Sequence, residues 1–335
     1  MPARTMRKRF WTPNGLFVTE RVARDLPAVT SRPVQPGQRG LFLFRVDADL
    51  YLKAGQEVFL ATARQYGIKT TWFVNISRYL EAPAGLEQLL KDDLVEVQSH
   101  AFRHQVYPDK ASNLDNLRQA EHYLPARPVK GVVAPYGDWN ENFQLSLEEL
   151  GYQYSSEFGL AYDRAPFYPR INGRESTVLQ IPIHPVCAGS FAYAGLPVDE
   201  ACRYFDRVIK DKYSQGVPII LYGHPNDRDV EYNRRILDSI FKSVAALSGV
   251  KSLSFSEYFE AWQSADREVK GEALKGRGGA RPLSANYSLL TKVRWLIVCL
   301  CSELKQRVLD DLLPPWGKQI VLNMWGKMKG MIGRG

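Results

Sequence analysis

Residues 95–104 read VEVQSHAFRH. The first four residues alternate between apolar and polar side chains, which predicts a strand with one apolar face. This strand would end at Ser99-His100, and a second histidine, His104, follows four positions later. If the chain turns helical after the strand, residues four apart lie on the same side, where two imidazoles can hold one divalent metal. Catalytic zinc usually takes three protein ligands, so a third, expected to be a carboxylate, must come from elsewhere.

An apolar run upstream ends in two acids, because residues 41–49 read LFLFRVDAD. The pattern predicts a buried strand that delivers carboxylates at its C-terminal end. Arg45, Asp47 and Asp49 alternate, so in an extended chain all three side chains point to one face. Two carboxylates this close repel each other unless a cation or a proton separates them. We therefore interpret one aspartate as a metal ligand and the other as a base.

Composition limits the classes of function. The 335 residues are 45% hydrophobic and 24% charged, which is ordinary for a folded soluble protein. The net charge of +8 is compatible with an acidic membrane surface, with anionic glycans or with no specific partner, whereas the lack of a dense basic stripe argues against nucleic acid as a partner. Four cysteines without zinc-site or disulfide-framework spacing favour a reducing compartment. We expect no signal peptide and no membrane-spanning run, and a cytoplasmic protein.

Strand and helix patterns alternate along the chain. We predict strands over about residues 41–47, 70–74, 95–98, 129–133, 152–156, 178–183, 218–224 and 250–254. We predict helices over about residues 52–66, 86–91, 113–123, 141–150, 198–213, 229–247 and 256–264. The alternation favours an α/β fold with parallel strands, either a barrel or a doubly wound sheet.

Polar side chains recur where the predicted strands end. They are Asp47, Asp49, His100, Pro135-Tyr136 and His224. In a β/α barrel the C-terminal strand ends share one rim, where active sites form. Four separate segments can therefore converge on one pocket.

Five segments, in this order along the chain, resemble the motifs of the NodB-homology polysaccharide deacetylases, carbohydrate esterase family 4. They are Val46–Asp49, Lys69–Phe73, Ser99–His104, Ala134–Gly137 and Leu221–His224. The phrases APYGDWN, YSSEFG and QIPIHP are similar to those of a branch associated with bacterial O-antigen gene clusters, the WbmS-like deacetylases. The resemblance implies an irregular (β/α) barrel of the polysaccharide-deacetylase type.

The resemblance also implies a hydrolase that uses a divalent metal, with zinc as the expected ion, to remove acyl groups from N-acylated sugars. The implied metal ligands are Asp49, His100 and His104. Asp47 would be the base that takes a proton from metal-bound water, and His224 the acid that protonates the leaving amine. The backbone N–H of Tyr136 would help to hold the oxyanion. The predicted substrate-binding residues are Pro135, Tyr136, Trp139 and His184, of which His184 follows a further strand.

Two features depart from the family pattern. Ala48 separates the two acids, which are usually adjacent, so the roles of base and ligand stay open between Asp47 and Asp49. The third motif usually carries an arginine that tethers the base, and that position is Val133 here. Arg45, on the same strand face as Asp47, can substitute for it. Without such a tether the base is poorly oriented, and activity would be weak, absent or different.

The sequence changes character on either side of the predicted barrel domain, residues 39–265. Residues 1–38 form a basic, proline-bearing arm, and glycines among basic residues over 266–285 predict a linker. Residues 286–335 predict an amphipathic helical tail, whose last part has apolar residues among lysines and an arginine and no acid. Its cations would favour anionic lipid headgroups. The alternative is a helix pair docked on the barrel or on a partner subunit.

We therefore predict a metal-dependent deacetylase that acts on an N-acetylated sugar or lipid-linked glycan of surface polysaccharide synthesis, in the cytoplasm or peripheral on the inner membrane. One alternative is an amidohydrolase acting on a non-sugar C–N bond. A second is a sugar-binding relative with weak or no turnover. A third is a non-enzymatic membrane or assembly factor, which would tolerate Asp47→Asn but not deletion of residues 286–335. The sequence does not identify the sugar, the acyl group, the metal or the oligomeric state.

Overall fold

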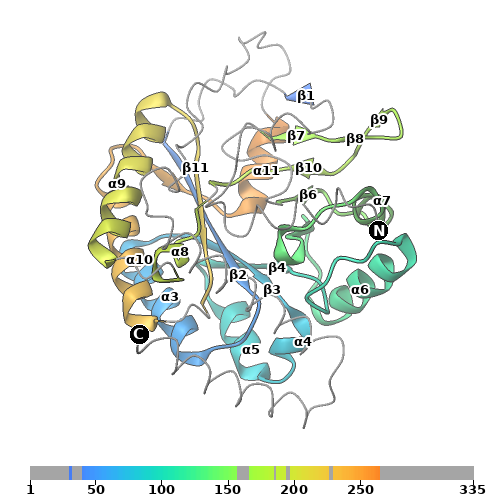
Figure 1. Ribbon diagram of the computed structural model, residues 1–335, viewed down its shortest axis with the longest axis horizontal. Helices are drawn as coiled ribbons and strands as arrows, with labels where there is room; N and C mark the ends of the chain where they lie inside the picture. Colours follow the sequence, from blue (N-terminus) through green and yellow to red (C-terminus); the bar gives the residue numbers. More distant parts are fainter. Residues whose placement is uncertain are drawn as a thin grey trace, which may run out of the picture. The chain divides into compact units, whose positions relative to one another are not determined.

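A computed structural model describes residues 30–31, 40–156, 166–184, 186–193, 197–225 and 229–264 (Figure 1). The predicted linker, the predicted tail and nearly all of the predicted N-terminal arm lie outside these residues. No helix among the described residues combines the length and apolarity that crossing a membrane requires.

The described residues form an α/β half-barrel around one open sheet, most of whose strands are parallel. Its parallel strands, in spatial order, are β11 (Ile219–Gly223), β2 (Leu41–Ala48), β3 (Thr70–Val74), β4 (Val95–Ser99), β5 (Gly131–Val132), β6 (Tyr154–Ser155) and β10 (Leu179–Gln180). β12 (Lys251–Ser252) also pairs with β2, and β7 (Phe167–Tyr168) and β1 (Thr30–Ser31) extend the sheet antiparallel beyond β10. The predicted α/β class with parallel, barrel-like strands is confirmed.

Nine helices lie around the sheet in the described part of the chain (Figure 1). They are α3 (Lys53–Tyr66), α4 (Ile76–Tyr79), α5 (Pro83–Lys91), α6 (Lys110–Tyr123), α7 (Glu141–Glu149), α8 (Ser190–Tyr193), α9 (Val198–Gln215), α10 (Val230–Ala245) and α11 (Phe255–Ser264). Helices α3, α9 and α10 pack together beside β11 and β2, and α6 and α7 pack together near β4 and β5. Each of these long helices follows a strand, as parallel pairing requires.

Strand β2 separates the two sides of the sheet by strict alternation. Phe42 and Phe44 point outward, and their rings pack on aromatic rings of α3 and α10. Leu43 points inward and joins a core cluster with residues of β3, β6 and α11. Arg45 and Asp47 follow on the same inner face and are almost fully buried. The central strand therefore supplies hydrophobic packing outside and a charged pair inside.

Helix α11 closes the end of the half-barrel opposite the strand ends that carry the polar residues. Its first backbone N–H, from Phe255, donates to Thr71 Oγ1 at 2.9 Å, and Ser256 N–H donates to Glu96 Oε2 at 3.3 Å. Thr71 and Glu96 lie near the starts of β3 and β4. Trp262, on the same helix, is buried in the core cluster. Packing fills this end and leaves the C-terminal strand ends for a site.

The predicted strands beyond β4 are longer than those observed. The runs predicted at 129–133, 152–156 and 178–183 each contribute only a two-residue strand. The sequence prediction also missed a hairpin between β8 (Arg170–Ile171) and β9 (Arg174–Glu175). Its turn residues, Asn172 and Gly173, have φ of 50° and 80°. Asn and Gly both tolerate the positive φ that such a turn requires, so this Asn-Gly pair is a hairpin signal that the sequence contains.

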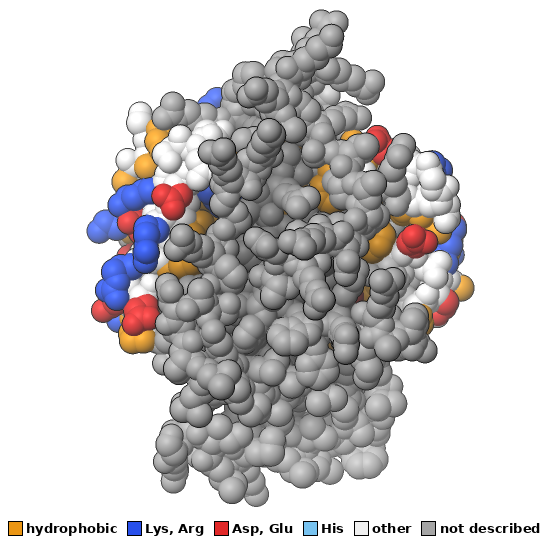
Figure 2. All heavy atoms as spheres, turned by 45° about the horizontal axis from the view of Figure 1, so that its top comes forward, with side chains coloured by type: hydrophobic (Ala, Val, Ile, Leu, Met, Phe, Trp, Pro, Cys, Tyr) orange, Lys and Arg blue, Asp and Glu red, His pale blue; other side chains and the backbone are white. Residues whose placement is uncertain are grey.

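Charged side chains of both signs are interspersed on the described surface that Figure 2 shows. Examples are the ion pair of Lys210 with Asp206 at 2.7 Å, within α9, and that of Asp199 on α9 with Arg235 on α10 at 2.7 Å. Such exposed pairs contribute about 0–1 kcal/mol each. They affect solubility more than the fold.

Candidate metal and catalytic site

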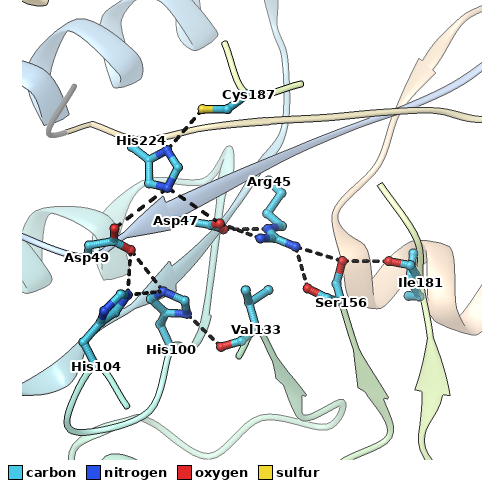
Figure 3. Close-up of polar contacts among 10 residues, drawn as sticks. All are labelled: Arg45, Asp47, Asp49, His100, His104, Val133, Ser156, Ile181, Cys187 and His224. Atoms are coloured by element: carbon cyan, nitrogen blue, oxygen red, sulfur yellow. Dashed lines mark hydrogen bonds and ion pairs between the residues drawn. The ribbon is translucent and has the colours of Figure 1, made fainter. Parts of the chain in front are cut away.

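The C-terminal ends of β2, β4 and β11 bring two carboxylates and three imidazoles into one place (Figure 3). Asp47 is the second-last residue of β2, and Asp49 lies one residue beyond the strand. His100 directly follows β4, and His224 directly follows β11. These ends adjoin because β2 pairs in parallel with both β11 and β3, and β3 pairs with β4.

The loop after β4, not a helix, brings the second histidine to the first. Ala101 has φ of 60°, so the chain turns away from the strand direction at once. Asn116 on α6 then fixes the loop: its Oδ1 accepts from Arg103 N–H at 2.7 Å, and its Nδ2 donates to the carbonyls of Arg103 and Gln105 at 3.1 and 2.9 Å. The conditional expectation of a helix here is wrong. His104 still faces the first histidine because the loop folds back.

Asp49, His100 and His104 form a compact triangle. Nε2 of His100 and Nε2 of His104 are 3.0 Å apart, and they lie 3.0 and 3.1 Å from Asp49 Oδ1. Nδ1 of His100 lies 2.7 Å from the Val133 carbonyl, which accepts its proton and leaves a lone pair on Nε2. The Asp49 carboxylate and this lone pair converge beside Nε2 of His104, where a cation or a proton has to separate them. Ligands about 2.0–2.1 Å from a common zinc ion are roughly 3–3.4 Å apart, so the residues fit a metal.

The protonation states of this triangle also suit a metal. Burial raises the pKa of the Asp49 carboxyl, but His104, His224 and hydrogen bonds from His100 and His104 outweigh it and hold the pKa well below its usual value. Burial lowers the pKa of His104, and the opposing attraction of Asp49 does not restore it. At neutral pH the carboxylate is therefore ionised and this imidazole neutral. These are the forms that ligate metals.

Arg45 holds the second carboxylate from the same strand. Its Nε donates to Asp47 Oδ1 at 2.6 Å and its Nη2 donates to Oδ2 at 2.5 Å, so both carboxylate oxygens are used. Nη1 donates to the carbonyl and the hydroxyl of Ser156 at 2.5 and 3.1 Å, and that hydroxyl donates to the Ile181 carbonyl. The guanidinium also lies 5.2 Å from the ring centroid of Tyr222. This buried, bidentate pair fixes the position of Asp47.

His224 faces both carboxylates. Its Nε2 lies 3.9 Å from Asp47 Oδ2 and 3.8 Å from Asp49 Oδ2. Its other ring nitrogen, Nδ1, lies 3.2 Å from Sγ of Cys187 (Figure 3). One imidazole thus connects the candidate metal ligands and the Arg45-bound carboxylate with a buried thiol.

Solved structures share this architecture. A putative polysaccharide deacetylase from Mycobacterium smegmatis matches with a TM-score of 0.58 and 16% sequence identity, over 70% of this chain and 95% of its own. Residues 48–155 match the sequence profile of the family described as polysaccharide deacetylase. The chain has the polysaccharide deacetylase fold.

Two further structures have the same deacetylase fold. A probable polysaccharide deacetylase from Pseudomonas aeruginosa PAO1 has a TM-score of 0.56 at 16% identity, over 71% of this chain and 95% of its own. The Puue allantoinase has a TM-score of 0.59 at 17% identity, over 73% of this chain and 98% of its own. A comparison with curated proteins gave no match. The polysaccharide deacetylase family is metal-dependent, and Asp49, His100 and His104 are the candidate ligands in this deacetylase fold.

The predicted substrate-binding residues near the third motif of the deacetylase fold lie in a short 3₁₀ turn, Pro135–Gly137. Tyr136 has φ of 59°, and its ring packs edge-on against His104 with centroids 4.4 Å apart. Trp139 is half-buried, and its indole N–H donates to Gln144 Oε1 at 2.8 Å. Tyr136 therefore borders the metal triangle, and Trp139 is oriented by helix α7.

His184 contacts strand β11 and helix α9, and its place in the substrate pocket stays a prediction. Its backbone N–H donates to the Ile220 carbonyl near the start of β11, and its Nε2 lies 2.8 Å from Tyr204 Oη on α9. The ring is buried and directed to that helix, so its contacts do not support the predicted place in the pocket.

Sequence reasoning missed three residues that organise the site: Asn116, Ser156 and Cys187. Asn116 and Cys187 do not end a predicted strand, and Ser156 carries no titratable group. Asn116 does sit on the helix that follows the histidine motif, where a buried amide can satisfy loop backbone. No pattern in the sequence pointed to Cys187.

Proposed function

We propose that this chain is a metal-dependent hydrolase that removes an acyl group from a sugar or glycan. The acyl group that we propose is N-acetyl. The observation that carries the proposal is the Asp49-His100-His104 triangle, with atoms 3.0–3.1 Å apart, next to the Arg45-bound Asp47. Three metal ligands and a separate, oriented carboxylate are what a catalytic metal site needs. The deacetylase fold supports acyl removal from polysaccharide-type substrates.

The contacts favour one division of roles between the two aspartates. Asp49 would join His100 and His104 in holding the divalent ion, for which we propose zinc. When bound, such an ion polarises the acyl oxygen and makes water a better nucleophile near neutral pH. Both oxygens of Asp47 already accept from Arg45, so Asp47 is a poor ligand and the better candidate for the base.

The proton transfers would run through Asp47 and His224. Asp47 would take a proton from the attacking water, whose oxygen forms the new bond to the acyl carbon. His224 would give its Nε2 proton to the amine nitrogen as the C–N bond breaks, so the products are a carboxylate and an amine. The Tyr136 backbone N–H would donate to the oxyanion, and such a donor contributes about 2.7–4 kcal/mol.

Two alternatives remain within the same fold. A non-sugar C–N bond is one candidate substrate, because an allantoinase shares the fold. The other alternative is a sugar-binding relative without turnover, which Val133 in place of the family arginine would favour. Arg45 supplies a bidentate partner to Asp47 from β2, which supports a working base.

We expect the zinc-loaded chain to release acetate from N-acetylglucosamine oligomers or peptidoglycan fragments and to leave allantoin intact. Enzymatic acetate detection and mass spectrometry of the sugar measure the first, and allantoate formation measures the second. The His100→Ala/His104→Ala variant is the inactive control. Turnover of allantoin alone would favour the non-sugar amidohydrolase. Glycan binding without acetate would favour the sugar-binding relative.

We also propose that the substrate is a lipid-linked glycan of surface polysaccharide synthesis, met at the cytoplasmic face of the inner membrane. The support is in the sequence: residues 316–335 contain lysines, an arginine and many apolar residues but no acid. Residues 266–285 would act as a linker between the barrel domain, residues 39–265, and the tail, residues 286–335. The phrases similar to the WbmS-like branch point to the same context.

We expect the full chain to co-sediment with vesicles containing about one-third anionic phosphatidylglycerol and a chain ending at residue 285 not to do so. Each lysine or arginine near such a surface contributes about 1 kcal/mol, so raised salt should weaken the binding. Neutral phosphatidylcholine vesicles are the control. Equal sedimentation of both chains, or no dependence on anionic lipid, would contradict the membrane proposal.

A further inference from the structure

Cys187 lies next to His224, the proposed proton donor. Its side chain is 1% exposed, and its Sγ lies 3.2 Å from Nδ1 of His224. The backbone N–H of Gly189 donates to the same sulfur at 3.4 Å. A sulfur has more than one lone pair, so Sγ can also accept from the Nδ1–H of the imidazole.

The segment that carries this thiol is fixed to strand β11. Ala188 N–H donates to the Tyr222 carbonyl at 2.9 Å, two residues before the histidine. A Cβ added at Gly223 would lie 3.4 Å from Ala188 Cβ and 3.3 Å from Phe59, so segment and strand are in close contact. The backbone next to Cys187 is therefore attached to the end of the strand that carries His224.

On the basis of the proposed function, we infer that Cys187 is a positioning residue for His224. A histidine that donates a proton must be an imidazolium, with a proton on each ring nitrogen, and a sulfur that accepts from Nδ1–H holds the ring in this orientation. Nε2 is then the nitrogen that faces Asp47 and Asp49, at 3.9 and 3.8 Å. The contact thus keeps the second N–H on the side where the amine would leave.

A nucleophilic role for the thiol does not fit. Cys187 is buried behind the imidazole, with His224 between its sulfur and the carboxylates (Figure 3). A glycan at the carboxylates would meet Nε2 and not Sγ. The thiol acts through the histidine, and partners of this kind typically change activity by about 10–100-fold.

Two substrates separate positioning from general damage. We expect Cys187→Ala to lower kcat on N-acetylglucosamine oligomers about tenfold or more, with little change in KM. On 4-nitrophenyl acetate the loss should stay below about twofold, because nitrophenolate leaves without a proton donor. Cys187→Ser, which keeps an acceptor for Nδ1–H, should recover most of kcat. Cys202→Ala, on α9, is the control and should match the unaltered chain on both substrates.

A second measurement needs no turnover. Long-range ¹H–¹⁵N spectra of the zinc-loaded, ¹⁵N-histidine-labelled chain report the tautomer of each of the five histidines. The His224 signals, assigned by their loss in His224→Asn, should show Nδ1–H on the neutral ring in the unaltered chain and in Cys187→Ser. In Cys187→Ala they should show a mixture of tautomers. These spectra test the inference even if neither substrate is hydrolysed, a result that would count against the proposed function alone.

Two outcomes overturn the inference. One is an unchanged His224 tautomer in Cys187→Ala. The other is an equal loss on the amide and the ester, which would mean that the alanine damages the site as a whole. Thermal unfolding of each variant accompanies the kinetics, so that a misfolded chain is recognised and the serine variant decides.

Discussion

The His100→Ala/His104→Ala variant is expected to keep no divalent metal after dialysis, whereas the unaltered chain keeps about one zinc ion per molecule. The variant loses two of three atoms that lie within 3.1 Å of one another, and Asp49 alone cannot hold the ion. Acetate release should disappear with the metal. Plasma mass spectrometry of the dialysed proteins measures the metal directly and needs no knowledge of the substrate.

The fold should survive this double substitution. The loop that carries His104 is held by Asn116 through backbone contacts, not by the imidazoles. Zinc at about 100 times its Kd should stabilise the unaltered chain by about 2.7 kcal/mol and should not stabilise the variant. His122→Ala, at an exposed position on α6, is the matched control and should keep the metal. No metal in the unaltered chain, even after reconstitution, would refute the hydrolase proposal and favour a binding role.

The strand ends of this site could be predicted because of how parallel strands pair. Apolar runs that end in Asp47, His100 and His224 place these residues on one edge of a sheet whatever the details of the loops. What lies beyond a strand end is less determined. β10 ends at Gln180, so His184 lies four residues past it, beside Ile220 of β11, and its ring contacts Tyr204.

The remaining features depend on long-range packing that no local pattern contains. The loop that carries His104 has an irregular shape. The buried side-chain amide of Asn116, which lies 12 residues later on α6, holds this loop in place. Cys187 reaches His224 from an irregular segment on the far side of β11. A periodicity of 2 or 3.6 residues predicts which residues share a face of a strand or helix. It does not predict the contacts that Asn116 and Cys187 make in the site.

The Arg45–Asp47 pair could take the place of the arginine that the family resemblance expects on another strand. The family pattern places the arginine at the position of Val133, whose side chain is buried in the core here. Arg45 reaches the same carboxylate from β2, two residues before it, and anchors itself on Ser156. A guanidinium needs only to present two parallel N–H bonds, so the strand that carries it can differ.

Arg45→Leu is therefore expected to be the most destabilising of these changes. It leaves a buried carboxylate without its cation, which costs about 3–5 kcal/mol. Turnover should also be lost, because Asp47 is no longer oriented. Arg45→Lys should rescue neither fully, since an ammonium cannot make two parallel bonds to one carboxylate. Urea unfolding measures the stability, and acetate release measures the activity.

A second substitution tests the cause. If the uncompensated charge is what destabilises Arg45→Leu, then adding Asp47→Asn should restore part of the lost stability while activity stays absent, because the amide carries no charge to desolvate. Arg64→Leu is the matched control: Arg64 pairs with Asp92 at 2.9 Å but its side chain is 64% exposed, so its loss should cost under about 1 kcal/mol. If Arg45→Leu costs no more than Arg64→Leu, or if the second substitution lowers stability further, the pair does not hold Asp47 as we propose. The base would then have to be oriented by another group, and Val133 would again argue for a chain that binds glycan without cleaving it.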